Sequence, residues 1–330
     1  MLAQAFEEET TMRFALMLEG QEGVTWAQWV EVAQTAERLG FEALFTSDHY
    51  YSVVGAAGRG SNDAWTILAG LAARTDRIRL GTMVSPVTFR HPTVLAKVAT
   101  TVDHISGGRV EIGIGAGWWE EEHRTHGFPF PAKDERFEIY EEQVEIVHGL
   151  LTQERFSFES PHYAIEGCEF LHKPVQRPHP PIVLGGTKAG SRMQRLVARF
   201  ADEFNTVGGT PEEVRERFGR IREGLEIAGR DPTSVTTSMM TWFFVGADEA
   251  EWRGRVERAR RNDPSAGSAE EYLEDLSRDC IVGAPDRAIE RLREYADAGV
   301  QRMVLNHQLV DDLEMLETFA AQVIPALADA

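Results

Sequence analysis

The chain has few of the residues that build disulfide-bonded, zinc-binding or membrane-spanning proteins. Its 330 residues include two cysteines, Cys168 and Cys280, which lie far apart and match no metal-binding or redox spacing. No apolar stretch approaches the roughly 20 residues that a membrane helix needs. We therefore expect free thiols in a reducing, cytoplasmic compartment and no membrane partner.

Positive charge is also scarce. The sequence has 34 lysines and arginines against 53 aspartates and glutamates, which gives a net charge of -19. Because phosphate backbones are bound by basic surfaces, this balance argues against nucleic acid as a partner. Hydrophobic residues make up 42% of the chain and charged residues 26%, as in ordinary soluble enzymes, so we expect a sizeable core and a small-molecule substrate.

The chain reads as one large domain. Residues 1–11 are acidic and lack the basic region and apolar run of a signal peptide, which predicts a flexible N-terminal extension. No linker rich in proline, glycine or serine interrupts the remainder. We therefore predict a single domain over residues 12–330, with insertions near 118–180 and 247–283, the second forming a helical lid.

Short apolar segments alternate with helical patterns along the domain, as in parallel α/β folds. Helices are expected to begin at capping boxes such as Thr25 with Gln28 and Thr210 with Glu213. The expected strands are 13–18, 43–46, 78–84, 110–115, a segment that begins at Ile182, 203–207, 235–245 and 301–306. Eight such strands predict a closed (β/α)8 TIM barrel, a fold that uses this chain length fully.

Polar residues follow the second expected strand without a spacer. Ser47, Asp48, His49 and Tyr50 come directly after residues 43–46. The carboxyl ends of barrel strands carry the chemistry of such folds, and an imidazole can donate or accept a proton near neutral pH. We predict that His49 is catalytic, against the alternative of a histidine satisfied in the core. Asp48 either orients His49 or caps the loop.

Two further strand ends are rich in glycine. Gly113, Gly115 and Gly117 alternate, which either lets a flat ring lie against the backbone or marks a bulge or tight barrel layer. Their spacing differs from the dinucleotide-binding fingerprint. Residues 185–190 lie between a strand and a helix, where free N–H groups would bind an anion. A plain turn is the alternative, and the lysine–serine or lysine–threonine pair of a P-loop is missing.

Residues 118–131 are expected to form a long polar loop that is rich in aromatics. It contains Glu120, Glu121, Glu122, His123 and His126. These side chains could be read as metal ligands, but nothing elsewhere supplies a matched set, so we expect a solvated charged face and no metal. Trp118 and Trp119 are predicted to wall an apolar substrate pocket, unless they only pack the loop down.

Taken together, these segments resemble the luciferase-like monooxygenase superfamily, specifically its branch that uses the deazaflavin coenzyme F420. The stretches that carry the resemblance are 47–50, 79–86, 88–92, 103–118, 185–187 and 283–285. They span nearly the whole chain from Met12 onward. The resemblance implies a (β/α)8 barrel with an insertion region and a coenzyme ring seated at the carboxyl ends of the strands.

The resemblance also implies roles for individual residues. Asp48 and His49 match the family's cofactor-ring and catalytic positions, and Met83–Val84 matches a bulge with a non-prolyl cis peptide that supports the ring. Glu19, at the end of the first strand, is expected to assist proton transfer. The remaining implied cofactor contacts are Ala116 and Gly117 for the coenzyme's side chain, and Gly185, Gly186 and Thr187 for its phosphate.

The implied activity follows from the ring. A deazaflavin carries carbon where a flavin has N5, so it favours hydride transfer and reacts poorly with oxygen. The resemblance therefore implies an F420-dependent oxidoreductase whose substrate lies under Trp118 and Trp119. The family's sugar-phosphate dehydrogenases have glutamate at the position of Trp118 and tryptophan at that of Val53, so this chain favours a more apolar substrate.

Two alternatives to this activity stay open. The same barrel could bind reduced FMN and oxygenate an aldehyde or sulfonate, or it could bind an anionic ligand without catalysis. Family members are often dimers, so a homodimer is one expectation, although the sequence identifies no self-complementary surface.

Overall fold

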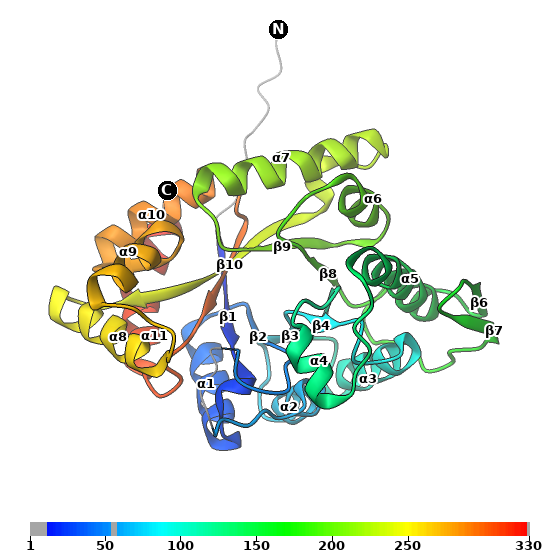
Figure 1. The fold of residues 1–330 in the computed structure, drawn as a ribbon, viewed down its shortest axis with the longest axis horizontal. Coiled ribbons are helices and arrows are strands. Elements are labelled where there is room, and N and C mark those ends of the chain that lie inside the picture. The colour runs from blue at the N-terminus through cyan, green and yellow to red at the C-terminus, as the bar shows by residue number, and fades with distance from the viewer. Residues whose placement is uncertain (1–11, 54–57, 329–330) are drawn as a thin grey trace, which may run out of the picture.

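The computed structural model describes residues 12–53 and 58–328, and the predicted extension over residues 1–11 lies outside the described part (Figure 1). At its centre is a closed ring of parallel strands. In ring order these are β1 (Arg13–Leu18), β2 (Ala43–Thr46), β3 (Arg79–Thr82), β5 (Val110–Gly115), β8 (Ile182–Gly185), β9 (Glu203–Val207), β10 (Thr236–Val245) and β12 (Arg302–Asn306). Because β10 pairs with β9 and β12, and β12 with β1, the (β/α)8 TIM barrel is confirmed.

Helices surround this ring; most connect successive strands, and the last two follow β12 (Figure 1). They are α1 (Trp26–Leu39), α2 (Ala64–Ala72), α3 (Pro92–Ser106), α5 (Lys133–Thr152), α6 (Ser191–Phe200), α7 (Pro211–Ile227), α10 (Pro285–Asp297), α11 (Leu313–Gln322) and α12 (Ile324–Ala328). Short 3-10 helices, η1 (Gly20–Glu22) and η2 (Pro232–Ser234), precede α1 and β10. Both capping boxes predicted from the sequence are present, at Thr25 and at Thr210. None of the described helices has the length and hydropathy of a membrane span.

The third expected strand, 78–84, is wrong at its end. β3 stops at Thr82, the Met83–Val84 peptide bond is cis as the resemblance implied, and β4 (Ser85–Pro86) pairs separately with β5. Glycines on the neighbouring strand make room for this change of direction. A Cβ at Gly113 would lie 1.9 Å from the carbonyl oxygen of Thr82, and one at Gly115 would lie 2.3 Å from Val84 Cγ2. These two glycines therefore belong to a tight barrel layer.

Two segments outside the barrel differ from a plain alternation of strands and helices. Between β5 and β8 the chain forms α4 (Glu120–His126), then α5, then an antiparallel hairpin of β6 (Phe156–Glu159) and β7 (Ala164–Cys168). The expected loop over 118–131 is thus wrong over α4, where three acidic residues start a helical turn. The hairpin was not expected.

The segment predicted as a helical lid is helical. It contains α8 (Glu249–Asn262) and α9 (Ala269–Asp279), and then β11 (Ile281–Gly283), which pairs with β10. Its apolar side chains, among them Trp252 on α8 and Leu276 on α9, pack with Phe244 on β10 in a cluster separate from the main core. These helices are therefore anchored on the barrel through β10.

The barrel interior contains a charged layer. Arg302 on β12 donates to both oxygens of Glu111 on β5, at 3.1 and 2.6 Å, and also pairs with Glu203 on β9. All three side chains are nearly inaccessible to solvent. Burial alone would raise the pKa of Glu111, but Arg302 and Arg79 outweigh it and lower that pKa to about 2.

Candidate active site

His49 and Glu122 form a buried pair at the carboxyl ends of the strands. His49 follows β2, and its Nδ1 lies 2.9 Å from Oε2 of Glu122 on α4. The other carboxylate oxygen of Glu122 accepts the backbone N–H of Tyr50. The Glu122 side chain is only 1% exposed. Because an ionised carboxylate only accepts, Nδ1 is the protonated ring nitrogen and Nε2 is left to exchange protons.

The predicted solvated face is therefore wrong for two residues of α4. Glu122 and His123 are both buried, whereas Glu120, Glu121 and His126 are exposed. His123 donates from Nδ1 to the Trp119 carbonyl at 2.7 Å and accepts from the Thr88 hydroxyl at 2.6 Å. These bonds hold the inner face of α4 against the strand ends. Among the described residues, no group of three or more His, Cys, Asp or Glu side chains could hold a metal ion.

The surroundings of His49 favour its protonated form. Burial lowers its pKa, but the hydrogen bond and charge of Glu122, with smaller contributions from the charges of Glu19 and Asp48, raise it by more. The net result is a pKa above the ordinary histidine value. The described residues offer no hydrogen bond to Nε2, so this atom is available to a bound molecule.

Asp48 has a different partner. Its carboxylate accepts from the Ser85 hydroxyl at 2.9 Å and forms a close ion pair with Arg90, which also binds Asp63 at 2.6 Å. Burial raises the pKa of Asp48, and Arg90 opposes that rise. The sequence left two roles open for Asp48, to orient His49 or to cap the loop. The side chain that bonds to the His49 ring is Glu122, not Asp48. Asp48 holds the end of β2 against Arg90 and β4.

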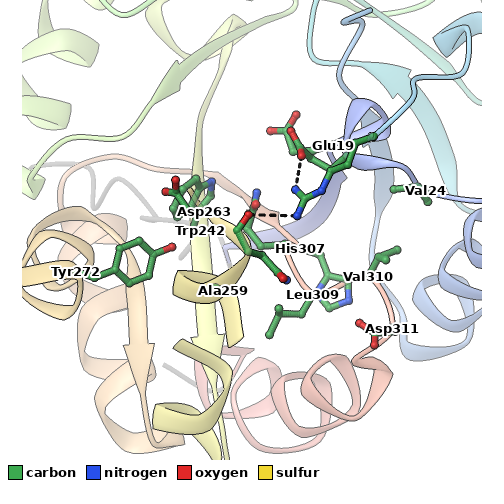
Figure 2. A pocket seen from close by; sticks show the side chains of 14 residues that line it. Glu19, Val24, Trp242, Ala259, Asp263, Tyr272, His307, Leu309, Val310 and Asp311 are labelled. Atoms are coloured by element: carbon green, nitrogen blue, oxygen red, sulfur yellow. Dashed lines mark hydrogen bonds and ion pairs between the residues drawn. The ribbon is translucent and has the colours of Figure 1, made fainter. Parts of the chain in front are cut away.

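Glu19 lies at the end of β1 within a network of amides. Its two oxygens accept from Asn306 at 2.6 Å and from Gln21 at 2.7 Å, and Asn306 in turn accepts from Gln308 at 2.8 Å. In the described part of the chain no cationic group pairs with it, so its negative charge remains to act on His49. Glu19 also lines a cavity of about 140 Å³ beside the strand ends (Figure 2).

Trp118 and Trp119 stand next to His49. Their rings are stacked on each other at 5.9 Å, and both meet the imidazole edge-on, at 5.9 and 6.2 Å between centroids. Trp118 is 64% exposed, which is unusual for so large an apolar ring. The structure thus brings the predicted substrate residues to the predicted catalytic residue, with apolar surface left uncovered.

The predicted cofactor contacts lie at neighbouring strand ends. Met83 is buried in the barrel interior, and Val84 packs within reach of the glycines of β5 and β8. Ala116 and Gly117, which follow β5, are half-buried. A Cβ at Gly117 would lie 3.0 Å from the Thr88 hydroxyl oxygen and the residue has φ of +77°, so this position suits glycine.

The predicted phosphate contacts are found where β8 leads into α6. Gly185 and Gly186 are half-buried and Thr187 is exposed. The helix has Gly190 as its N-cap, and no side chain caps its first N–H groups. Free amides at a helix N-terminus suit an anionic group. The N–H of Gly186 in this turn donates to the Asn205 carbonyl at 3.0 Å, so the free amides are those at the start of α6.

Two residues of this site were missed in the sequence, Glu122 and Arg90. A signal for Glu122 was present, because on a helix that starts at Glu120 the residues 119, 122, 123 and 126 share one face. Arg90 carried no comparable signal. Its partner Asp48 is 42 positions away, and only the fold brings the two together.

The sequence matches the family model described as luciferase-like monooxygenase over residues 10–302. The chain belongs to this family.

Named relatives use two different cofactors. The chain is 30% identical over 313 residues to an F420-dependent glucose-6-phosphate dehydrogenase from Microbacterium testaceum, covering 88% of this chain and 90% of the relative. It is 26% identical to the FMNH2-dependent dimethylsulfone monooxygenase of Pseudomonas putida, covering 91% and 87%. An F420-dependent secondary alcohol dehydrogenase, solved with an F420–acetone adduct, superposes with a TM-score of 0.81 at 20% identity, covering 96% and 99%.

Proposed function

We propose that this protein is an F420-dependent oxidoreductase that moves a hydride between the deazaflavin and a small, rather apolar organic molecule. Support comes from the sequence similarity to the F420-dependent dehydrogenase of Microbacterium testaceum, which extends over 88% of this chain. The observation that carries the proposal is the buried His49–Glu122 pair at the barrel mouth, because hydride transfer to or from a C–O group requires a matched proton.

The coenzyme would be held by the strand ends already described. Asp48, His49, Met83 and Val84 would surround its ring, Ala116 and Gly117 its side chain, and Gly185, Gly186 and Thr187 its phosphate. The uncapped N–H groups of α6 and the exposed turn before it support the last assignment. When bound, the deazaflavin supplies a two-electron acceptor or donor that reacts poorly with oxygen.

His49 would carry the proton that accompanies the hydride. In oxidation of an alcohol, the C–H bond gives up a hydride and the O–H bond gives up a proton, which Nε2 accepts to leave the carbonyl product. In the reverse direction Nε2 returns the proton to the oxygen. Glu122 keeps Nδ1–H directed toward itself and stabilises the imidazolium, while Glu19 adds a second negative charge nearby.

Trp118 and Trp119 would cover the reacting atoms. Their apolar faces exclude water from His49 and offer a surface to an apolar substrate. A phosphorylated sugar would gain little from this wall.

A titration of the purified protein with oxidised F420 and, separately, with FMN tests the proposal. We expect F420 binding that quenches its fluorescence, and a loss of roughly 10²-fold or more in turnover for His49→Ala. Tight binding of FMN with oxygen consumption would instead support the monooxygenase alternative, for which the Pseudomonas putida relative is the supporting observation. F420 binding without hydride exchange would support the non-catalytic alternative.

A further inference from the structure

A cavity lies between the strand ends and the lid helices α8 and α9. Its volume is about 140 Å³, and its wall extends from Glu19 after β1 to Tyr272 on α9 (Figure 2). The wall is mostly polar, with four carboxylates, the amides of Asn262 and Gln308 and the guanidinium of Arg59. A cavity of about 150 Å³ accommodates benzene in another protein, so this one suits a molecule of that size.

Negative charge in this wall exceeds positive charge. The four carboxylates are those of Glu19, Glu22, Asp263 and Asp311. Glu22 is paired with Arg59 at 2.5 Å, and Asp311 is paired with Arg258 at 3.2 Å. Glu19 accepts from two amides and Asp263 from the Ser265 hydroxyl, and neither has a cationic partner among the described residues. Two negative charges therefore remain uncompensated at the cavity.

Tyr272 presents an unpaired hydroxyl to the same cavity. The residue is 9% exposed, and its hydroxyl lies on the side of the other lining residues (Figure 2). The hydroxyl forms no hydrogen bond with a described residue and, unlike the ring nitrogens of His307, it is not sealed off by protein atoms. Burial and the charge of Asp263 raise the pKa of Tyr272 to about 12, so the phenol is uncharged near neutral pH. Its oxygen can then accept a hydrogen bond from a bound molecule.

These groups select a ligand that carries positive charge and donates hydrogen bonds. A phosphate or carboxylate placed here would face uncompensated negative charge. A metal ion fits less well, because the described residues bring no three metal-binding side chains together. Trp242 adds an indole to the wall, and aromatic rings attract organic cations. We propose that the cavity binds a small organic ammonium ion of about benzene size, whose N–H groups donate to Asp263 and to the Tyr272 hydroxyl.

The test compares two probes of nearly the same shape, cyclopentylamine and cyclopentanol, by saturation-transfer NMR on the full-length protein without coenzyme. At neutral pH the amine is protonated, and we expect it to bind roughly 10-fold or more tightly than the alcohol. Asp263→Asn should weaken amine binding roughly 10-fold, because a hydrogen bond to a charged acceptor is replaced by one to a neutral acceptor. Tyr272→Phe should weaken it roughly 2- to 10-fold. Asp275→Asn, at an exposed position on α9, is the matched control.

Equal affinity for the two probes, no binding of the amine, or the same amine affinity in Asp263→Asn and Asp275→Asn would overturn the inference. Should Asp263→Asn not fold, wild-type crystals soaked with cyclopentylamine give a second test. Density for the amine against Asp263 and Tyr272 supports the site, and density elsewhere or none overturns it.

This inference goes beyond the proposed function, because binding here needs neither coenzyme nor reaction, and the two fail separately. Amine binding that depends on Asp263, in a protein that does not bind F420, would overturn the proposed function alone. Hydride exchange with F420, in a protein that does not bind cyclopentylamine, would overturn the cation site alone.

Discussion

Replacing Glu122 with glutamine would remove one negative charge from His49 and leave the size of the side chain nearly unchanged. The glutamine carbonyl can still accept the Tyr50 N–H, so the loop after β2 should keep its position. What is lost is an ionised acceptor 2.9 Å from Nδ1. Burial then acts against the protonated ring with less compensation, and the pKa of His49 should fall.

The size of the effect follows from that single bond. A hydrogen bond to a charged group contributes about 1.5–3 kcal/mol, and about 1.4 kcal/mol corresponds to a tenfold change in rate. If the imidazolium forms or discharges in the transition state, Glu122→Gln should lower kcat/KM roughly 10- to 150-fold. Glu121→Gln is the matched control, since it removes the same charge from an exposed position on the same helix.

Two measurements test this prediction. Histidine NMR against pH, with the His49 signals assigned from a His49→Gln spectrum, should show the lower pKa in Glu122→Gln. In the pH profile of F420 turnover, the change in rate that follows the titration of His49 should lie at lower pH in Glu122→Gln than in the wild type. This should hold in both reaction directions. If Glu122→Gln gives the same results as Glu121→Gln in both measurements, His49 and Glu122 do not act as a unit.

Three further changes are expected to have distinct effects. Arg302→Met should destabilise the fold by about 3–5 kcal/mol in urea unfolding at neutral pH, because it leaves the buried Glu203 carboxylate without its cation and Glu111 with Arg79 alone. The pKa of Glu111 is about 2 in the folded protein, below its ordinary 4.5, so the ionised carboxylate stabilises the fold above pH 4.5 and this stabilisation is lost as the pH falls toward 2. The difference in unfolding free energy between the wild type and Arg302→Met should therefore become smaller in acid. Gly113→Ala should destabilise by about 1–3 kcal/mol or more through its contact with the Thr82 carbonyl, whereas Gly219→Ala, on an exposed face of α7 with open space, should not. Trp118→Ala should raise KM and change the melting temperature little, since an exposed substitution rarely alters stability by more than about 0.5 kcal/mol.

Much of the fold could be predicted because its signals are local. A capping box needs four consecutive residues, and both boxes are found where Thr25 and Thr210 indicated them. The strand bounds Arg13–Leu18, Ala43–Thr46 and Val110–Gly115 agree with the sequence residue for residue, because buried parallel strands are continuous apolar runs between polar turns.

The missed features depend on contacts between distant segments. Glu122 meets His49 across 73 positions, and the helix that presents it was taken for a loop because its first turn is almost entirely charged. Gly113 and Gly115 are likewise explained by a distant segment, because Thr82 at the end of β3 and Val84 between β3 and β4 occupy the space where their Cβ atoms would stand. From the sequence, these alternating glycines could form either a wall for a flat ring or a tight barrel layer. The choice between the two depends on how neighbouring strands pack.

The carboxylates around His49 differ in their partners, and this difference affects the pH at which His49 is protonated. Asp48 is ion-paired with Arg90, Glu19 is held by two amides, and Glu122 bonds directly to the imidazole. The raised pKa of His49 means that the ring keeps its proton to a higher pH than an ordinary histidine does. A protonated Nε2 can give a proton to a carbonyl oxygen, so reduction should be favoured at pH values below that raised pKa. Oxidation of an alcohol needs the neutral ring and should therefore rise with pH.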